Sequence, residues 1–150
     1  MTEEIKNSPN RDRPQQLSLL CILSFIGGGA SILSNLILYS TFDQIKEFFK
    51  DGSTQMILGT EIDMSFIISI NPDFFIWQIA LFSFSVYGAF LMWNMKMHGF
   101  HIYSVSQILL LIIPEIYVPS MPFPLLEISI TIVFILLYFK NLKIIGKGEL

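Results

Sequence analysis

Residues 16–42 read QLSLLCILSFIGGGASILSNLILYSTF and contain no charged side chain. About 20 helical residues cross a hydrocarbon core of about 30 Å, so this stretch can span a bilayer with some tilt. Three further apolar runs follow at residues 74–95, 97–114 and 128–139, and the last two reach spanning length with one glutamate each at the edge. The sequence therefore predicts an all-α integral membrane protein, a four-transmembrane-helix antiparallel bundle.

The overall composition supports a membrane protein. Hydrophobic residues make up 53% of the chain and charged residues 14%, against about 25% in a typical soluble domain. A chain of 150 residues has room for four helices and short connections, but not for an additional soluble catalytic domain. The basic residues are too few and too scattered for a nucleic-acid-binding surface.

The positions of lysine and arginine predict the orientation in the membrane. One side would carry seven of them: Lys6, Arg11, Arg13, Lys96, Lys140, Lys143 and Lys147. The other side would carry only Lys46 and Lys50. Because positively charged loops stay on the cytoplasmic side, we expect both termini in the cytoplasm, and we assign the chain to a bacterial cytoplasmic (inner) membrane.

The boundaries of the predicted elements follow from charge, proline and glycine. We expect a polar cytoplasmic tail (1–15), a transmembrane domain (16–145) and a second cytoplasmic tail (144–150). The four helices of the domain are expected at about 16–42, 73–95, 99–118 and 123–143. The extracytoplasmic loop, 43–72, has Ile45, Phe48 and Phe49 at helical spacing, which predicts a short interfacial helix ended at Gly52. The apolar stretch 64–70 is too short to span and reads as a buried strand or an interfacial segment.

A cleaved signal peptide is the alternative interpretation of the first run. Arg11 and Arg13 precede an apolar stretch, and Gly28 and Ala30 resemble a small-residue cleavage site. The run continues to Phe42, however, and cleavage would leave about 12 apolar residues, too few to span. An uncleaved helix is therefore the favoured interpretation.

Small and weakly polar residues predict which helix faces meet, because lipid provides no hydrophobic force that drives helices together. Each helix has one such stripe at a spacing of 100° per residue. The expected packing residues are Ser24, Gly28, Ser31 and Asn35 on the first helix, Gln78, Ser85 and Ala89 on the second, Ser104 and Gln107 on the third, and Thr131 on the fourth.

Glu115 and Glu127 are the strongest candidates for proton or ion handling. Both would lie near the outer surface, on either side of a short proline-rich turn, where two carboxylates could share a proton. In the alternative interpretation, both extend to the headgroups or accept structural hydrogen bonds. The two interpretations make different predictions for transport.

Residues for other chemistry are missing from the sequence. Cys21 is the only cysteine, which excludes an internal disulfide and leaves it the role of a small buried hydrophobe. His98 and His101 have a spacing that suits a metal, but acidic partners are lacking nearby, so no metal and no cofactor are expected. No nucleophile elbow and no phosphate-binding glycine loop is present.

These observations favour a non-enzymatic membrane protein. We expect it to act by helix packing with itself, as a homo-oligomer, or as an accessory subunit of a membrane complex. The alternative is a small transporter, channel or proton-linked subunit that uses Glu115 and Glu127.

Overall fold

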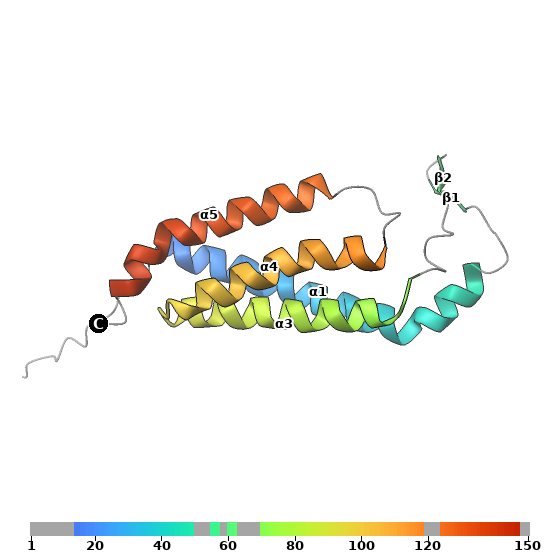
Figure 1. The fold of residues 1–150 in the computed structure, drawn as a ribbon, viewed down its shortest axis with the longest axis horizontal. Coiled ribbons are helices and arrows are strands. Elements are labelled where there is room, and N and C mark those ends of the chain that lie inside the picture. The colour runs from blue at the N-terminus through green and yellow to red at the C-terminus, as the bar shows by residue number, and fades with distance from the viewer. Residues whose placement is uncertain (1–13, 50–54, 58–59, 63–69, 119–123, 148–150) are drawn as a thin grey trace, which may run out of the picture.

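The computed structural model describes residues 14–49, 55–57, 60–62, 70–118 and 124–147, and its long elements are four helices (Figure 1). They are α1 (Gln15–Phe49), α3 (Asp73–Trp93), α4 (His98–Tyr117) and α5 (Leu125–Lys147). All four are long and apolar enough to cross a membrane, which confirms the helical character predicted from hydropathy.

Helix α1 is longer than the sequence analysis predicts. It continues through Phe42 to Phe49, so the expected separate interfacial helix is instead the end of α1. The hydroxyls of Ser40 and Thr41 both donate hydrogen bonds to the carbonyl of Ile37, at 2.9 and 2.8 Å. Such bonds favour helix bending, and the last turns of α1 (teal) turn toward the strands in Figure 1. We call the segment from Asp43 to Phe49 the arm.

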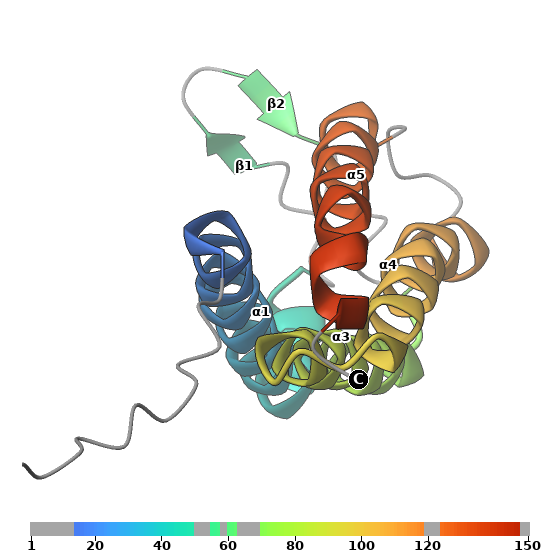
Figure 2. The same ribbon diagram turned by 90° about the vertical axis from the view of Figure 1, so that its left-hand side faces the viewer.

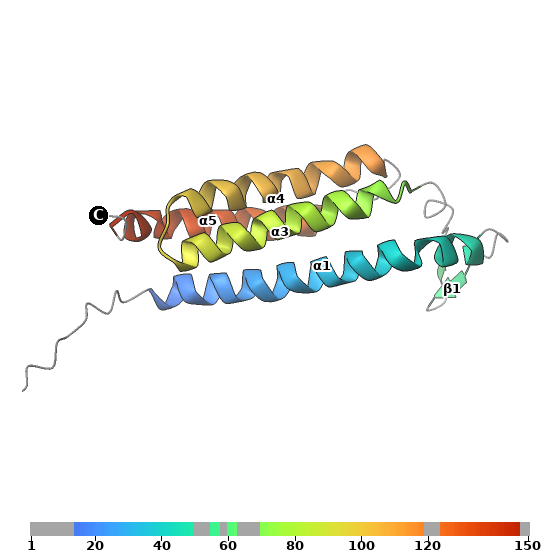
Figure 3. The same ribbon diagram turned by 90° about the horizontal axis from the view of Figure 1, so that it is seen from below.

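Helices α3 and α4 form a closely packed pair, which Figure 3 shows side by side. The Asn71 carboxamide oxygen accepts a hydrogen bond from the Asp73 backbone at 3.0 Å and orders the start of α3. A tight turn joins the two helices, and in this turn Met95 has a positive φ of 59°. Near that turn the helices approach at Gly88 and Gly99, where neither has a side chain to hold them apart.

Helix α5 packs less extensively than the other three. Its buried side chains in the described part of the chain are Tyr138 and Asn141, both in its C-terminal half. Toward its N-terminus, Leu125, Leu126 and Ile130 are exposed. Figures 1 and 2 show the corresponding divergence of α5 from α1 and α4 along its length.

The apolar core consists of two clusters at opposite ends of the helices. The larger cluster contains Leu17, Leu20, Cys21, Ala89, Met92, Phe100, Tyr103 and Tyr138. The smaller one contains Phe42, Ile70, Phe74, Phe75 and Val118. Cys21 is fully buried, as predicted. The central part of the helices lies between the two clusters.

The segment between α1 and α3 contains two short strands that the sequence analysis does not predict. Strands β1 (Gln55–Ile57) and β2 (Thr60–Ile62) pair antiparallel, with Gln55 opposite Ile62. Of the apolar stretch 64–70, only Ile70 lies within the described residues, and it is buried in the smaller cluster. The strand or interfacial segment predicted for the rest of that stretch falls outside the described residues.

Candidate functional site

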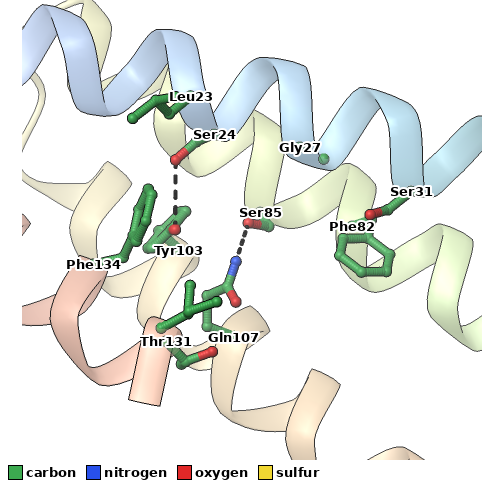
Figure 4. A pocket seen from close by; sticks show the side chains of 12 residues that line it. Leu23, Ser24, Gly27, Ser31, Phe82, Ser85, Tyr103, Gln107, Thr131 and Phe134 are labelled. Atoms are coloured by element: carbon green, nitrogen blue, oxygen red, sulfur yellow. Dashed lines mark hydrogen bonds between the residues drawn. The ribbon is translucent and has the colours of Figure 1, made fainter. Parts of the chain in front are cut away.

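A cavity of about 210 Å³ lies between the four helices, next to the larger apolar cluster (Figure 4). Residues from all four helices form its wall: Leu23, Ser24, Gly27, Gly28 and Ser31 of α1, Phe82 and Ser85 of α3, Tyr103 and Gln107 of α4, and Ile130, Thr131 and Phe134 of α5. The wall therefore combines apolar surface with hydroxyl and carboxamide groups, and none of the lining residues is charged.

A hydroxyl cluster joins α1, α4 and α5 at one end of the cavity. The Ser24 and Tyr138 hydroxyls are hydrogen bonded at 2.9 Å, and Ser24 also donates to the Tyr103 hydroxyl at 3.5 Å. The two tyrosine rings meet edge to face, with their centroids 4.8 Å apart. Because Tyr103 and Tyr138 are almost completely buried, this cluster fixes how α5 docks on the other helices.

A second polar pair crosses from α4 to α3. Gln107 donates from Nε2 to the Ser85 hydroxyl at 2.9 Å (Figure 4). Ser85 is buried, with 3% of its surface exposed. The half-buried Gln107 amide can bond through its carbonyl as well as its NH₂ group, and this bond uses only an NH₂ proton. The pair therefore holds α3 and α4 in register and leaves the Gln107 carbonyl oxygen available.

Glycines on α1 allow the close approach that forms this wall. A Cβ atom at Gly28 would collide with a methyl group of Val86 on α3. At Gly27 and Gly29 an added Cβ would meet nothing within 4 Å. Of the three consecutive glycines, Gly28 is the one at a helix contact, and Gly27 borders the cavity on the exposed side.

The structure places the residues expected for packing in several environments. Six line the cavity: Ser24, Gly28, Ser31, Ser85, Gln107 and Thr131. Gln78 and Ala89 are buried outside it. Asn35 is half-buried and donates to the backbone carbonyl of Ser31 at 2.9 Å. The Ser104 hydroxyl is buried and has no hydrogen-bond partner among the described residues.

The two carboxylates lie on the surface, away from the cavity wall. Both Glu115 and Glu127 are exposed, and neither makes a hydrogen bond or ion pair within the part of the chain that the structure describes. His98 and His101 are likewise exposed. Among the described residues, no three His, Cys, Asp or Glu side chains gather where they could hold a metal ion.

The cavity wall is polar in part but uncharged. Its hydroxyl and carboxamide groups can donate and accept hydrogen bonds, but its wall contains no carboxylate, imidazole or amine that could act as a general base. A charged group bound in this cavity would pay a high desolvation cost, because no lining side chain can pair with an ion. Recognition of a neutral polar group is the chemistry that these residues support.

Several residues of the site were not singled out from the sequence. Tyr103 has no distinctive signal in the sequence, because an aromatic residue in an apolar run resembles ordinary lipid-facing surface. Gly88 lies outside the cavity wall, in the α3–α4 contact, and the sequence analysis predicts its neighbour Ala89 as the packing residue. The i, i+3 spacing of Ser85 and Gly88 is the signal that could have identified a small-residue contact there.

Comparisons of the chain with protein-family models, with curated proteins and with solved structures find no match. A proposal for its function therefore rests on the arrangement of its own residues.

Proposed function

We propose that the chain is a non-enzymatic multi-pass membrane protein that works as an accessory subunit of a membrane complex. In this proposal the four helices cross a bacterial inner membrane as an antiparallel bundle, with both termini in the cytoplasm. The charge distribution supports this orientation, because Lys96 and Lys140 lie near the end of the bundle that carries the α3–α4 turn, whereas Lys46 lies at the other end.

The observation that carries the proposal is the unbroken length of α1. Its 35 residues extend about 52 Å at about 1.5 Å per residue, well beyond a hydrocarbon core of about 30 Å. The charged residues Asp43, Lys46 and Glu47 fall in the last turns, where they would be outside the lipid. The arm would therefore project from the outer face as a continuation of a membrane helix.

The arm has the features of a docking element. Lys46 Nζ lies 5.6 Å from the centre of the Phe42 ring, a cation–π contact that supports the helix beyond the bend. Phe48 is 62% exposed in a segment that would face water, not lipid. Exposed aromatic side chains on a rigid element are common anchors at protein interfaces. We infer that a partner protein contacts the arm and the adjacent β1–β2 hairpin.

Purification of the tagged protein in mild detergent tests this proposal. We expect one partner to co-purify at fixed stoichiometry, with crosslinks from the partner to the arm. Phe48→Ala should release the partner, because it removes an aromatic anchor and leaves the membrane helices unchanged.

Phe84→Ala is the matched control, since Phe84 has a similar exposure of 57% but lies on α3 within the membrane-spanning part. Retention of the partner by both variants, or its loss from both, would contradict a docking role of the arm. A wild-type protein that purifies alone, as a monomer, would contradict the accessory-subunit proposal itself.

A further inference from the structure

The cavity between α1, α3, α4 and α5 contains hydrogen-bonding groups that the chain itself does not use. Among the described residues, the Ser31 and Thr131 hydroxyls have no hydrogen-bond partner, and neither does the carbonyl oxygen of Gln107. All three side chains line the cavity. An uncompensated polar group costs free energy in an apolar environment, so these three groups favour an occupant that supplies partners.

Five other hydroxyls on the helices have a partner within their own helix. Each of the following donates to a backbone carbonyl of the preceding helical turn, at 2.8 or 2.9 Å: Ser40, Thr41, Ser83, Ser106 and Ser129. Such a bond is the usual arrangement for serine and threonine on a membrane helix. The hydroxyls of Ser18, Ser34 and Ser104 also lack such a bond among the described residues, but they do not line the cavity. Ser31 and Thr131 lie on two helices that face each other across the same cavity, and two unbonded hydroxyls on one wall point to a ligand.

The size and charge of the cavity limit that ligand. A cavity of about 150 Å³ is enough to hold benzene, so about 210 Å³ accommodates about eight non-hydrogen atoms of a lipid head, not a whole lipid. No lining residue is charged, which disfavours an ion or a phosphate. The α1 residues of the cavity wall lie near the middle of the uncharged stretch 16–42, deep in the membrane of the proposed topology. An uncharged head reaches that depth at far lower cost than a charged one.

The exposed part of the cavity wall shows where a ligand would enter. Leu23, Gly27 and Ile130 line the cavity and are also exposed at the surface of α1 and α5. These two helices diverge along their length (Figure 2). A molecule with a polar head in the cavity could therefore extend its hydrocarbon chains sideways, between α1 and α5, into the bilayer.

We propose that this cavity binds the head of an uncharged glycerolipid with a free hydroxyl, of the diacylglycerol type. The lipid hydroxyl donates to the Gln107 carbonyl oxygen, and the ester carbonyls accept from the Ser31 and Thr131 hydroxyls. The acyl chains leave between α1 and α5. This site is independent of the arm, so its test does not depend on the partner protein.

Photolabelling of the full-length protein in phosphatidylcholine nanodiscs tests the proposal, with a diacylglycerol probe that carries a diazirine in one acyl chain. We expect saturable labelling of α1 and α5. Unlabelled diacylglycerol should displace the probe, whereas additional phosphatidylcholine with the same acyl chains should not. Thr131→Val keeps the side-chain shape and removes the hydroxyl, and should weaken binding about three- to tenfold. Ser129→Ala, which changes an exposed hydroxyl on the same helix, should leave binding unchanged.

Two glycine variants distinguish a loss of lipid binding caused by filling the cavity from one caused by a general disturbance of α1. An added Cβ meets nothing within 4 Å at either Gly27 or Gly29, but only Gly27 lines the cavity. Gly27→Leu should therefore reduce labelling at least fivefold, and Gly29→Leu should not. Equal labelling of these two variants would overturn the proposal. Non-saturable labelling, equal displacement by phosphatidylcholine, or displacement by a long-chain alcohol but not by diacylglycerol would overturn it as well.

Discussion

Gly88 of α3 and Gly99 of α4 face each other so closely that neither position has room for a methyl group. A Cβ atom on Gly88 would lie 2.9 Å from the Gly99 carbonyl oxygen and 2.7 Å from the backbone nitrogen of Tyr103. A Cβ on Gly99 would lie 2.5 Å from the Gly88 carbonyl oxygen. The atoms in the way belong to the backbone, which side-chain rotation cannot move. This contact sets the spacing of the α3–α4 pair, and so the position of Tyr103 in the cavity wall.

Gly88→Ala should destabilise the protein by about 1–3 kcal/mol, because the helices must separate to admit the methyl group. Thermal unfolding in detergent measures the loss. Gly29→Ala is the control, since an added Cβ there meets nothing within 4 Å and alanine favours the helix by up to about 1 kcal/mol. Equal melting temperatures for the two variants would contradict the close α3–α4 contact.

Gly28→Ala should also destabilise the protein, because the new methyl group collides with the Val86 side chain. Here the obstacle is a side chain, so a second substitution can remove it. Val86→Ala in the Gly28→Ala background should restore part of the stability, although Val86→Ala alone lowers it. Additive losses in a double-mutant cycle, measured by thermal unfolding, would place Gly28 away from Val86.

Tyr138→Phe should cost about 0.5–1.5 kcal/mol, since it removes the hydroxyl that is bonded to Ser24 at 2.9 Å. Ser24→Ala should cost at least as much, because Ser24 contacts the hydroxyls of both Tyr138 and Tyr103. The two changes together should cost less than their sum. Ser129→Ala, at an exposed hydroxyl bonded to its own helix, should change the unfolding free energy by less than about 0.5 kcal/mol.

Glu115→Gln and Glu127→Gln should leave proton flux at the level of the unmodified protein, which we expect to equal that of empty vesicles. Both carboxylates are exposed, and the cavity wall contains neither of them. Proteoliposomes with an interior pH dye and an imposed gradient provide the measurement. A flux in the unmodified protein that Glu127→Gln abolishes would favour the proton-linked alternative.

The four helices were predictable because hydropathy adds up along the chain, and an uncharged stretch such as residues 16–42 has few alternatives to a helix in lipid. The continuation of α1 through Phe42 was not predictable, because its last turns are polar. Nothing in the local sequence decides whether the helix continues with a bend or ends and starts again. Residue spacing brought Ser24, Gly28 and Ser31 onto one face of α1. Residue spacing could not reveal the cavity that these residues form with Thr131, because the cavity depends on where α5 docks. The docking of α5 depends on the contact between Tyr138 and Ser24, which are far apart in the sequence.

The proposed topology is tested by finding on which side of the membrane the arm and the α3–α4 turn lie. In a Cys21→Ala background, Glu47→Cys places a thiol on the arm and Lys96→Cys places one in the α3–α4 turn, and both positions are exposed. A membrane-impermeant maleimide should label Glu47→Cys in intact cells and Lys96→Cys only after the membrane is opened. Labelling of both from the same side, or of Lys96→Cys alone in intact cells, would contradict the proposed topology.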